Sequence, residues 1–102
     1  MPASSVASKT GYVYILASRR NGTLYIGVTS NLVQRVRDHK EGTLQGFTSR
    51  YGVTDLVYVE THPRISDAIR REKQLKTWRR AWKLELIERD NPEWRDLYAS
   101  FV

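Results

Sequence analysis

The pattern of apolar and polar positions predicts a β-hairpin near the N-terminus. Residues 11–17 alternate between two faces, and residues 24–28 do the same after the turn sequence Asn21-Gly22. On the first strand, one face carries Tyr12, Tyr14 and Leu16, and the other carries Val13, Ile15 and Ala17. On the second strand, one face carries Leu24, Ile26 and Val28, and the other carries Tyr25 and Gly27. Three tyrosines are therefore expected on neighbouring strands.

Helical spacing follows the hairpin. Asn31, with Gln34 three residues later, has the form of a capping box, and Thr29 and Ser30 are rival caps. The helix that begins there places one stripe of side chains on its inner face: Leu32, Arg35, Val36 and His39. An arginine and a histidine in an otherwise apolar stripe need an explanation.

The rest of the chain predicts one more strand and further helices. Residues 41–53 form a loop or a short helix, and residues 56–60 form a third strand with alternating faces, which His62-Pro63 ends. Helices are expected from near residue 66 to about 79 and from about 82 to 89. Asn91-Pro92 predicts the cap of a last short helix that holds Trp94, Leu97 and Tyr98. This order predicts an α+β fold, a small three-stranded antiparallel sheet flanked by helices.

Length and composition narrow the class of protein. The 102 residues suit a single domain over residues 10–102, preceded by a small polar tail, residues 1–9, which is expected to be flexible. The chain has no cysteine, which excludes disulfides and Cys-ligated metal sites and fits a cytoplasmic protein. No apolar run approaches the roughly 20 residues that a membrane span needs. The net charge of +6 favours a polyanionic partner, nucleic acid before an anionic membrane.

Glu72 interrupts the apolar stripe of the second long helix. Its neighbours on that stripe are Ile65, Ala68, Ile69 and Leu75. An unpaired carboxylate facing a sheet costs several kcal/mol or raises its own pKa, so Glu72 requires a partner. Two interpretations stay open, a structural ion pair with an arginine and a ligand for a divalent metal.

The other unusual positions also allow two interpretations. Arg35 is either the ion-pair partner of Glu72 or a phosphate ligand, and His39, one turn later, is either a boundary residue or a catalytic group. The tyrosines form either an ordinary aromatic core or part of a site. Gly27 next to them leaves space, as a glycine inside a strand often does where a ligand or another backbone approaches.

A strongly basic stretch runs from Arg70 to Lys83, with seven basic residues against the single acid Glu72. It is either a face that follows a phosphate backbone or a solvated helix surface, and its interleaved Trp78 and Trp82 are expected in the core. The candidate contacts to nucleic acid are Lys40, Arg50, Tyr51, Lys73, Lys76, Arg79 and Arg80.

Taken together, these motifs resemble the GIY-YIG nuclease superfamily, in particular its small single-domain bacterial members. The second signature is intact as Tyr25-Ile26-Gly27, and the first is degenerate as Tyr12-Val13-Tyr14. Arg35 lies where the family places its helix arginine, and His39 lies where many members carry a histidine. Ala68-x-x-x-Glu72-x-x-x-Lys76 resembles the glutamate motif, and the closing stretch from Asn91 to Leu97 resembles the single-domain subgroup.

The resemblance implies a metal-dependent endonuclease that hydrolyses DNA. Glu72 would hold Mg²⁺ or Mn²⁺, and Arg35 would stabilise the charge of the transition state. Tyr14 is the first choice as general base, with Tyr25 in support and His39 as proton shuttle. Asn91 fits the family's active-site asparagine and a helix cap equally well.

The resemblance leaves the biological role open between DNA repair or recombination and the processing of foreign DNA. Protein partners or a homodimer would supply target specificity, because the chain carries no added recognition domain. Two alternatives remain beside the nuclease. One is a nucleic-acid-binding module whose catalysis has decayed, and the other is a scaffold for repair proteins.

Overall fold

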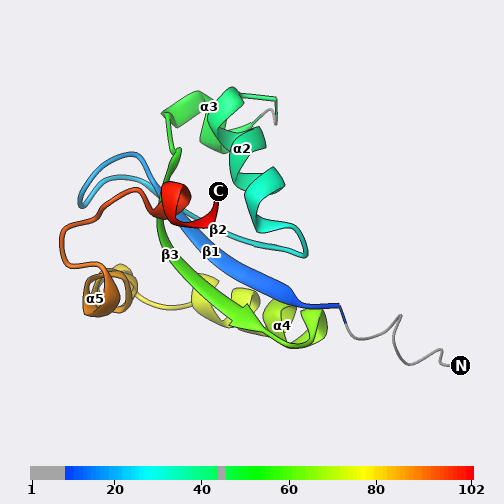
Figure 1. The fold of residues 1–102 in the computed structure, drawn as a ribbon. Helices are drawn as coiled ribbons and strands as arrows, with labels where there is room; N and C mark the ends of the chain where they lie inside the picture. Colours follow the sequence, from blue (N-terminus) through cyan, green and yellow to red (C-terminus); the bar gives the residue numbers. More distant parts are fainter. Residues whose placement is uncertain (1–8, 44–45) are drawn as a thin grey trace, which may run out of the picture.

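A three-stranded antiparallel sheet with helices on both faces forms the centre of the computed structural model (Figure 1). The structure describes residues 9–43 and 46–102, so residues 1–8 of the expected tail lie outside it. The strand order is β2-β1-β3, with β1 (Gly11–Ala17) between β2 (Leu24–Thr29) and β3 (Asp55–His62). The α+β architecture expected from the sequence is therefore confirmed.

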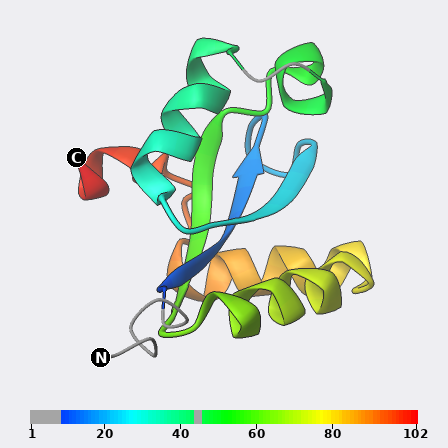
Figure 2. The same cartoon turned by 90° about the vertical axis from the view of Figure 1, so that its right-hand side faces the viewer.

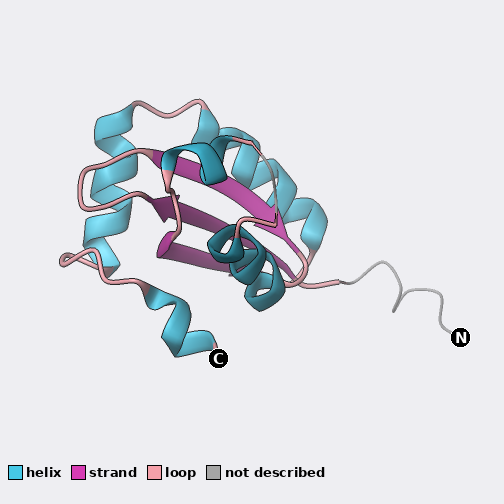
Figure 3. Ribbon diagram, turned by 90° about the horizontal axis from the view of Figure 1, so that it is seen from above, coloured by secondary structure: helices cyan, strands magenta, loops and turns pink. Residues whose placement is uncertain are grey.

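The helices lie in two layers, one on each side of the sheet (Figures 2 and 3). One layer holds α2 (Leu32–Glu41) and α3 (Phe47–Tyr51), and the other holds α4 (Ile65–Lys76) and α5 (Arg80–Asp90). A 3₁₀ turn, η1 (Leu97–Phe101), packs against the α2 side near the C-terminus. Within the described ranges, no helix combines the length and the apolar character needed to cross a membrane.

The alternation in the hairpin divides the core into two clusters, one on each face of the sheet. The cluster under α4 and α5 contains Val13, Ile15, Ala17, Ile26, Val57, Tyr58, Ala68, Leu75, Leu86, Ile87 and Trp94. The cluster under α2 contains Tyr14, Leu16, Leu32, Val36, Val53 and Leu56, with Tyr12 and Tyr25 packed against it. The tyrosines of both hairpin strands therefore face the α2 layer.

The start of α2 follows the predicted capping pattern. Asn31 Oδ1 accepts a hydrogen bond from the Gln34 amide at 3.3 Å, so Asn31 is the cap and not Thr29 or Ser30. Thr29 supports the turn, because its Oγ1 accepts from the Asn31 amide at 3.0 Å. The helix ends at Gly42, whose φ of 72° lies in the left-handed region that glycine adopts at low cost.

The stripe on α4 is narrower than the sequence suggests. Ala68, Glu72 and Leu75 are buried, but Ile69, predicted on the same inner stripe, is 39% exposed at its edge. The helix also ends at Lys76, and α5 begins at Arg80. Trp82, expected in the core, is 48% exposed, because α5 turns Leu86 and Ile87 inward instead.

Two features of the C-terminal half depart from the predicted pattern. Asn91 ends α5 and does not cap a following helix, since the last helical turn begins only at Leu97. In β3, a bulge between the partners of Ile15 and Leu16 turns both Val57 and Tyr58 toward the α4 side, so the expected alternation is interrupted. Asn91 Nδ2 donates to the carbonyl of Val57 at 3.2 Å, which links the two features.

Candidate active site

A chain of three buried side chains connects the hairpin to α2 and α3. The hydroxyl of Tyr14, on β1, lies 3.0 Å from Nε2 of His39, on α2. Nδ1 of His39 lies 2.9 Å from Oγ1 of Thr48, on α3. Tyr14 is 1% exposed, and His39 and Thr48 are each 4% exposed. Both ring nitrogens of the histidine are therefore engaged in the interior of the protein.

Gly27 provides the space for the Tyr14 ring. A Cβ at position 27 would lie 2.4 Å from the Tyr14 hydroxyl oxygen and 2.5 Å from the carbon that bears it. The space beside the glycine, which the sequence predicts where a ligand or another backbone approaches, is thus filled by the phenol. Tyr25 completes the aromatic group, with ring centroids 6.3 Å from Tyr14 and 5.2 Å from His39.

Burial raises the pKa of Tyr14 and lowers the pKa of His39. Burial, then the neighbouring Tyr25, raises the pKa of Tyr14 far above its usual value, and the positive charge of Arg35 opposes this rise. Burial, then Arg35, lowers the pKa of His39 below its usual value. At neutral pH both groups are uncharged, so one nitrogen of His39 donates a hydrogen bond while the other accepts one.

Arg35 lies on α2 but does not belong to the buried stripe. Its side chain is exposed, whereas Leu32, Val36 and His39 on the same helix are buried. Of the four residues predicted on the inner face of this helix, three are buried and Arg35 is not. Arg35 nevertheless lies near enough to influence the titration of both Tyr14 and His39. Its guanidinium is an exposed positive charge beside a buried, neutral hydrogen-bond chain.

Glu72 lies in the buried stripe of α4, as the sequence predicts, and is 9% exposed. Its partner is not an arginine, however. Oε2 of Glu72 lies 2.6 Å from Nζ of Lys76, one turn later on α4, and the lysine side chain is 54% exposed. The structural ion pair with Arg35 that was one interpretation of both residues is thus wrong. The negative charge of Glu72 is the smallest of the four effects on the pKa of Tyr14, and it raises that pKa.

The residues near Glu72 fit a loosely held Mg²⁺ or Mn²⁺ rather than a closed metal cage. No group of three or more His, Asp or Glu side chains that could bind a metal occurs in residues 9–43 and 46–102. Magnesium commonly takes one or two protein carboxylates and fills its other positions with water and substrate phosphate. A single carboxylate with an exposed, movable lysine beside it is compatible with that mode of binding.

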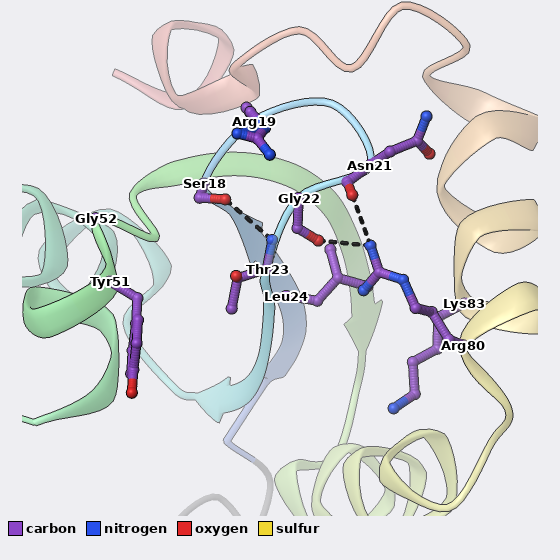
Figure 4. Close-up of a pocket in the computed structure, with 10 residues that line it drawn as sticks. All are labelled: Ser18, Arg19, Asn21, Gly22, Thr23, Leu24, Tyr51, Gly52, Arg80 and Lys83. Atoms are coloured by element: carbon purple, nitrogen blue, oxygen red, sulfur yellow. Dashed lines mark hydrogen bonds between the residues drawn. The ribbon is translucent and has the colours of Figure 1, made fainter.

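The predicted nucleic-acid contacts are spread over several elements. Lys40 is occupied elsewhere, because its Nζ donates to Asp96 Oδ2 at 2.5 Å and to the carbonyl of Thr54 at 3.0 Å. The remaining six, Arg50, Tyr51, Lys73, Lys76, Arg79 and Arg80, are exposed on α3, α4 and the start of α5. Of these, Tyr51 and Arg80 line one groove at the tip of the hairpin (Figure 4).

The side chain of Asn91 is buried and hydrogen-bonded to the protein backbone. It is 5% exposed, and its side-chain amide donates to the carbonyls of Val57 and Arg95, at 3.2 and 2.9 Å. Its Oδ1 accepts from the Arg95 amide at 3.0 Å. Both amide hydrogens are therefore used within the protein, which leaves none to bind a phosphate.

Thr48 is the residue of this arrangement that sequence reasoning missed. It lies nine residues after His39, across the end of α2, so no helix or strand period relates the two positions. The one available signal was a hydroxyl residue inside a segment rich in glycine and polar residues.

Comparison with known proteins finds a family model, sequence relatives and a solved structure that resemble this chain. Residues 10–85 match the model of the GIY-YIG catalytic domain. The chain is 39% identical over 77 residues to a UPF0213 protein of Staphylococcus haemolyticus, a match that covers 76% of this chain and 93% of that one. A UPF0213 protein of Syntrophus aciditrophicus is 39% identical over 83 residues, with 80% and 93% covered. The solution NMR structure of a UPF0213 protein from Bacillus halodurans superposes with a TM-score of 0.54 at 28% identity, over 85% of this chain and 92% of that one.

Proposed function

The chain belongs to the GIY-YIG family, and we propose that it is a divalent-metal-dependent endonuclease that hydrolyses phosphodiester bonds of DNA. The observation that carries the proposal is the buried chain Tyr14–His39–Thr48, with the charges of Arg35 and Glu72 both acting on the pKa of Tyr14. In this proposal residues 10–102 act as one catalytic domain.

The hydrogen-bond chain supports a proton transfer that avoids a free phenolate. Tyr25, which is partly exposed, orients the attacking water. The proton of the water passes to the Tyr14 hydroxyl oxygen as the Tyr14 proton moves to Nε2 of His39. The imidazolium formed in this way donates Nδ1–H to Thr48 Oγ1. Because the raised pKa of Tyr14 disfavours its anion, transfer through a neutral histidine makes the tyrosine usable near pH 7.

The bond changes at phosphorus follow from the same step. The water oxygen forms the new P–O bond while the bond to the leaving sugar oxygen breaks, and that oxygen takes a proton from solvent. Arg35 is exposed and positively charged, which suits it to the phosphate oxygens whose charge grows during attack. When bound, Mg²⁺ or Mn²⁺ would be held by Glu72 and would supply charge stabilisation at the phosphate and the leaving oxygen.

One observation favours a second candidate, a nucleic-acid-binding module whose catalysis has decayed. Lys76 places its ammonium 2.6 Å from the carboxylate that the metal would need. If this pair is permanent, it excludes the metal, and the protein binds DNA in a salt-sensitive way without cutting it. The nuclease is preferred because binding alone requires neither a carboxylate that is 9% exposed nor a buried tyrosine–histidine pair.

The experiment is plasmid nicking and linearisation with Mg²⁺, with Mn²⁺ and with EDTA. We expect cleavage only with metal, and we expect Glu72→Gln to abolish it while the melting temperature stays near that of the parent. Glu85→Gln, on the exposed face of α5, is the matched control and keeps activity. Cleavage by Glu72→Gln at the parent rate would refute the site assignment. Metal-dependent cleavage by Lys76→Ala, but not by the parent, would favour the decayed module.

We propose that the activity serves DNA repair or recombination, or the processing of foreign DNA. The compartment is the cytoplasm, which a chain without cysteine fits. Target specificity would come from protein partners or a second copy of the chain.

A further inference from the structure

A concave surface lies at the tip of the hairpin. This hairpin-tip groove has a volume of about 860 Å³. Its floor is the turn between β1 and β2, one wall is the end of α3, and the other wall is the start of α5 (Figure 4). Three of the residues that line it are basic, namely Arg19, Arg80 and Lys83, and none is acidic.

One cation of the groove is fixed and two are available. Nη2 of Arg80 donates to the carbonyls of Asn21 and Gly22, at 2.8 and 2.6 Å, and so fastens α5 to the hairpin tip. Across the described part of the chain, neither Arg19 nor Lys83 forms an ion pair. Positive charge without acidic partners in a concave surface attracts phosphate oxygens.

The opposite wall presents an aromatic ring. Tyr51 is 53% exposed, and Figure 4 shows its side chain across the groove from Arg80 and Lys83. The guanidinium of the neighbouring Arg50 lies 5.8 Å from the centre of the Tyr51 ring. A ring on one wall and cations on the other match the two parts of a nucleotide, since the base stacks and the phosphate pairs with charge.

The groove is connected to the candidate active site through the elements that form both. Leu24 at its floor immediately precedes Tyr25 on β2. The helix α3 carries Thr48 toward His39 and, one turn later, Tyr51 toward the groove. A strand that occupies the groove would therefore contact β2 and α3, two elements that also carry residues of the candidate active site.

We infer that the hairpin-tip groove binds unpaired nucleotides of the DNA strand next to the scissile phosphate, with Tyr51 stacked on a base and Arg19 and Lys83 on phosphates. The inference rests on the proposed function for its choice of DNA. A duplex keeps its bases stacked inside and offers this concave surface only phosphates, so an aromatic wall adds affinity only for an unpaired base. The groove thus confers a preference for DNA that is single-stranded beside the cleavage point.

The first test measures the stacking wall. Fluorescence anisotropy in EDTA gives the affinity of the full chain for labelled oligothymidylate and for a blunt duplex of equal length. We expect Tyr51→Ala to weaken binding of the single strand about tenfold and binding of the duplex by less than about twofold, because a stacked base contributes on that order. Tyr51→Trp restores the single-strand affinity. Equal losses on both DNAs, or no loss on either, would overturn the stacking role.

The second test measures the cationic wall. The double variant Arg19→Ala/Lys83→Ala removes two phosphate contacts, so the slope of log affinity against log salt for the single strand should fall by about 1.4. The matched control is Arg70→Ala/Arg95→Ala, which removes the same charge from exposed positions outside the groove. A control variant with the same change in slope would mean that net charge, and not the groove, governs binding.

These measurements separate the inference from the proposed function. They are made without metal and without cleavage, so a protein that never cuts DNA can still show the tyrosine-dependent preference. Conversely, plasmid cleavage with no effect of Tyr51→Ala or of the groove double variant on single-strand binding would leave the nuclease intact and refute the groove.

Discussion

At the scale of single residues, the contact between Gly27 and Tyr14 explains why a phenol is tolerated in the core. The ring fits only because position 27 has no side chain, and its hydroxyl is satisfied by His39 at 3.0 Å. A valine or isoleucine at position 14 would bury as well but would offer His39 no partner. The polar atom is thus built into the core with its acceptor, which points to chemistry rather than to packing alone.

Thr48 is predicted to tune His39 rather than to touch DNA. In the proposed mechanism, its hydroxyl oxygen accepts Nδ1–H and so stabilises the imidazolium that forms during proton transfer. Thr48→Val removes this acceptor, so the pKa of His39, already lowered by burial, falls further. A weaker base transfers the proton more slowly, and we expect cleavage to slow by about ten- to hundredfold.

The pH profile of cleavage distinguishes this role from a purely structural one. The proposed mechanism needs neutral His39, so we expect the rate to fall as pH drops through the pKa of that residue, which lies below its usual value of about 6.5. In Thr48→Val the acidic limb should move to lower pH, whereas Thr48→Ser keeps the parent profile. A valine variant with a reduced rate but an unmoved limb would show that Thr48 merely supports packing.

At the scale of elements, the features that depend on local sequence patterns were predicted well, and the features that depend on contacts between distant residues were missed. The hairpin and α2 were predicted closely, because alternation, the Asn21-Gly22 turn and the Asn31 cap act within a few residues. The bulge in β3 and the position of Asn91 were missed, since each depends on the other across 34 residues of sequence.

The candidate site shows the same division between local pattern and long-range contact. The family resemblance selected Tyr14, Tyr25, Arg35, His39 and Glu72 for the same site. It could not reveal the exposure of Arg35, the pairing of Glu72 with Lys76, or the contact with Thr48. These details depend on how α2, α3 and α4 are placed around the sheet, and no periodicity in a single element encodes that placement.

A charged network at the end of β3 is predicted to stabilise the edge of the sheet in a pH-dependent way. The Glu60 carboxylate accepts hydrogen bonds from Tyr58 at 2.5 Å and from Arg71 at 2.9 to 3.1 Å, and His62 lies 2.9 Å away. Partial burial raises the pKa of Glu60, but bonds from Arg71, Tyr58 and His62 outweigh it and hold the pKa below its usual value.

A carboxyl group with a lowered pKa stabilises the fold above its unfolded pKa and loses that effect as pH falls through its folded pKa. We therefore expect Glu60→Gln to cost about 2 kcal/mol of unfolding free energy at pH 7. The difference from the parent should shrink as the pH falls below about 4.3. Urea denaturation at a series of pH values measures it, and a constant difference down to pH 3 would contradict the assignment.

At the scale of the whole molecule, the C-terminal segment holds the layer that carries His39. Asp96 Oδ1 accepts from the amides of Leu56, on β3, and Tyr98, in η1, both at 3.1 Å. Its Oδ2 accepts from Lys40, which lies on α2 directly after His39. Bonds from Lys40 and the two amides lower the pKa of Asp96 against the opposing effect of its burial. One carboxylate thus joins three elements that are distant in sequence.

Removal of this carboxylate should therefore affect catalysis as well as stability, although Asp96 lies beyond residues 10–85, the part that matches the family model. We expect Asp96→Ala to lower the unfolding free energy by about 2–3 kcal/mol, because three bonds to a charged acceptor are lost at once. Since α2 then loses one of its attachments next to β3 and keeps only the bond from Lys40 to the Thr54 carbonyl, the Tyr14–His39 distance becomes less well held and kcat falls. The affinity for DNA, which the proposal assigns to exposed cations elsewhere, should change little. Urea titration, single-turnover cleavage and anisotropy measure the three quantities.

Lys40→Ala should reproduce a smaller part of the losses in stability and in cleavage rate. A variant of Asp96 that is destabilised but cleaves at the parent rate well below its melting temperature would show that the segment supports the fold without positioning the site.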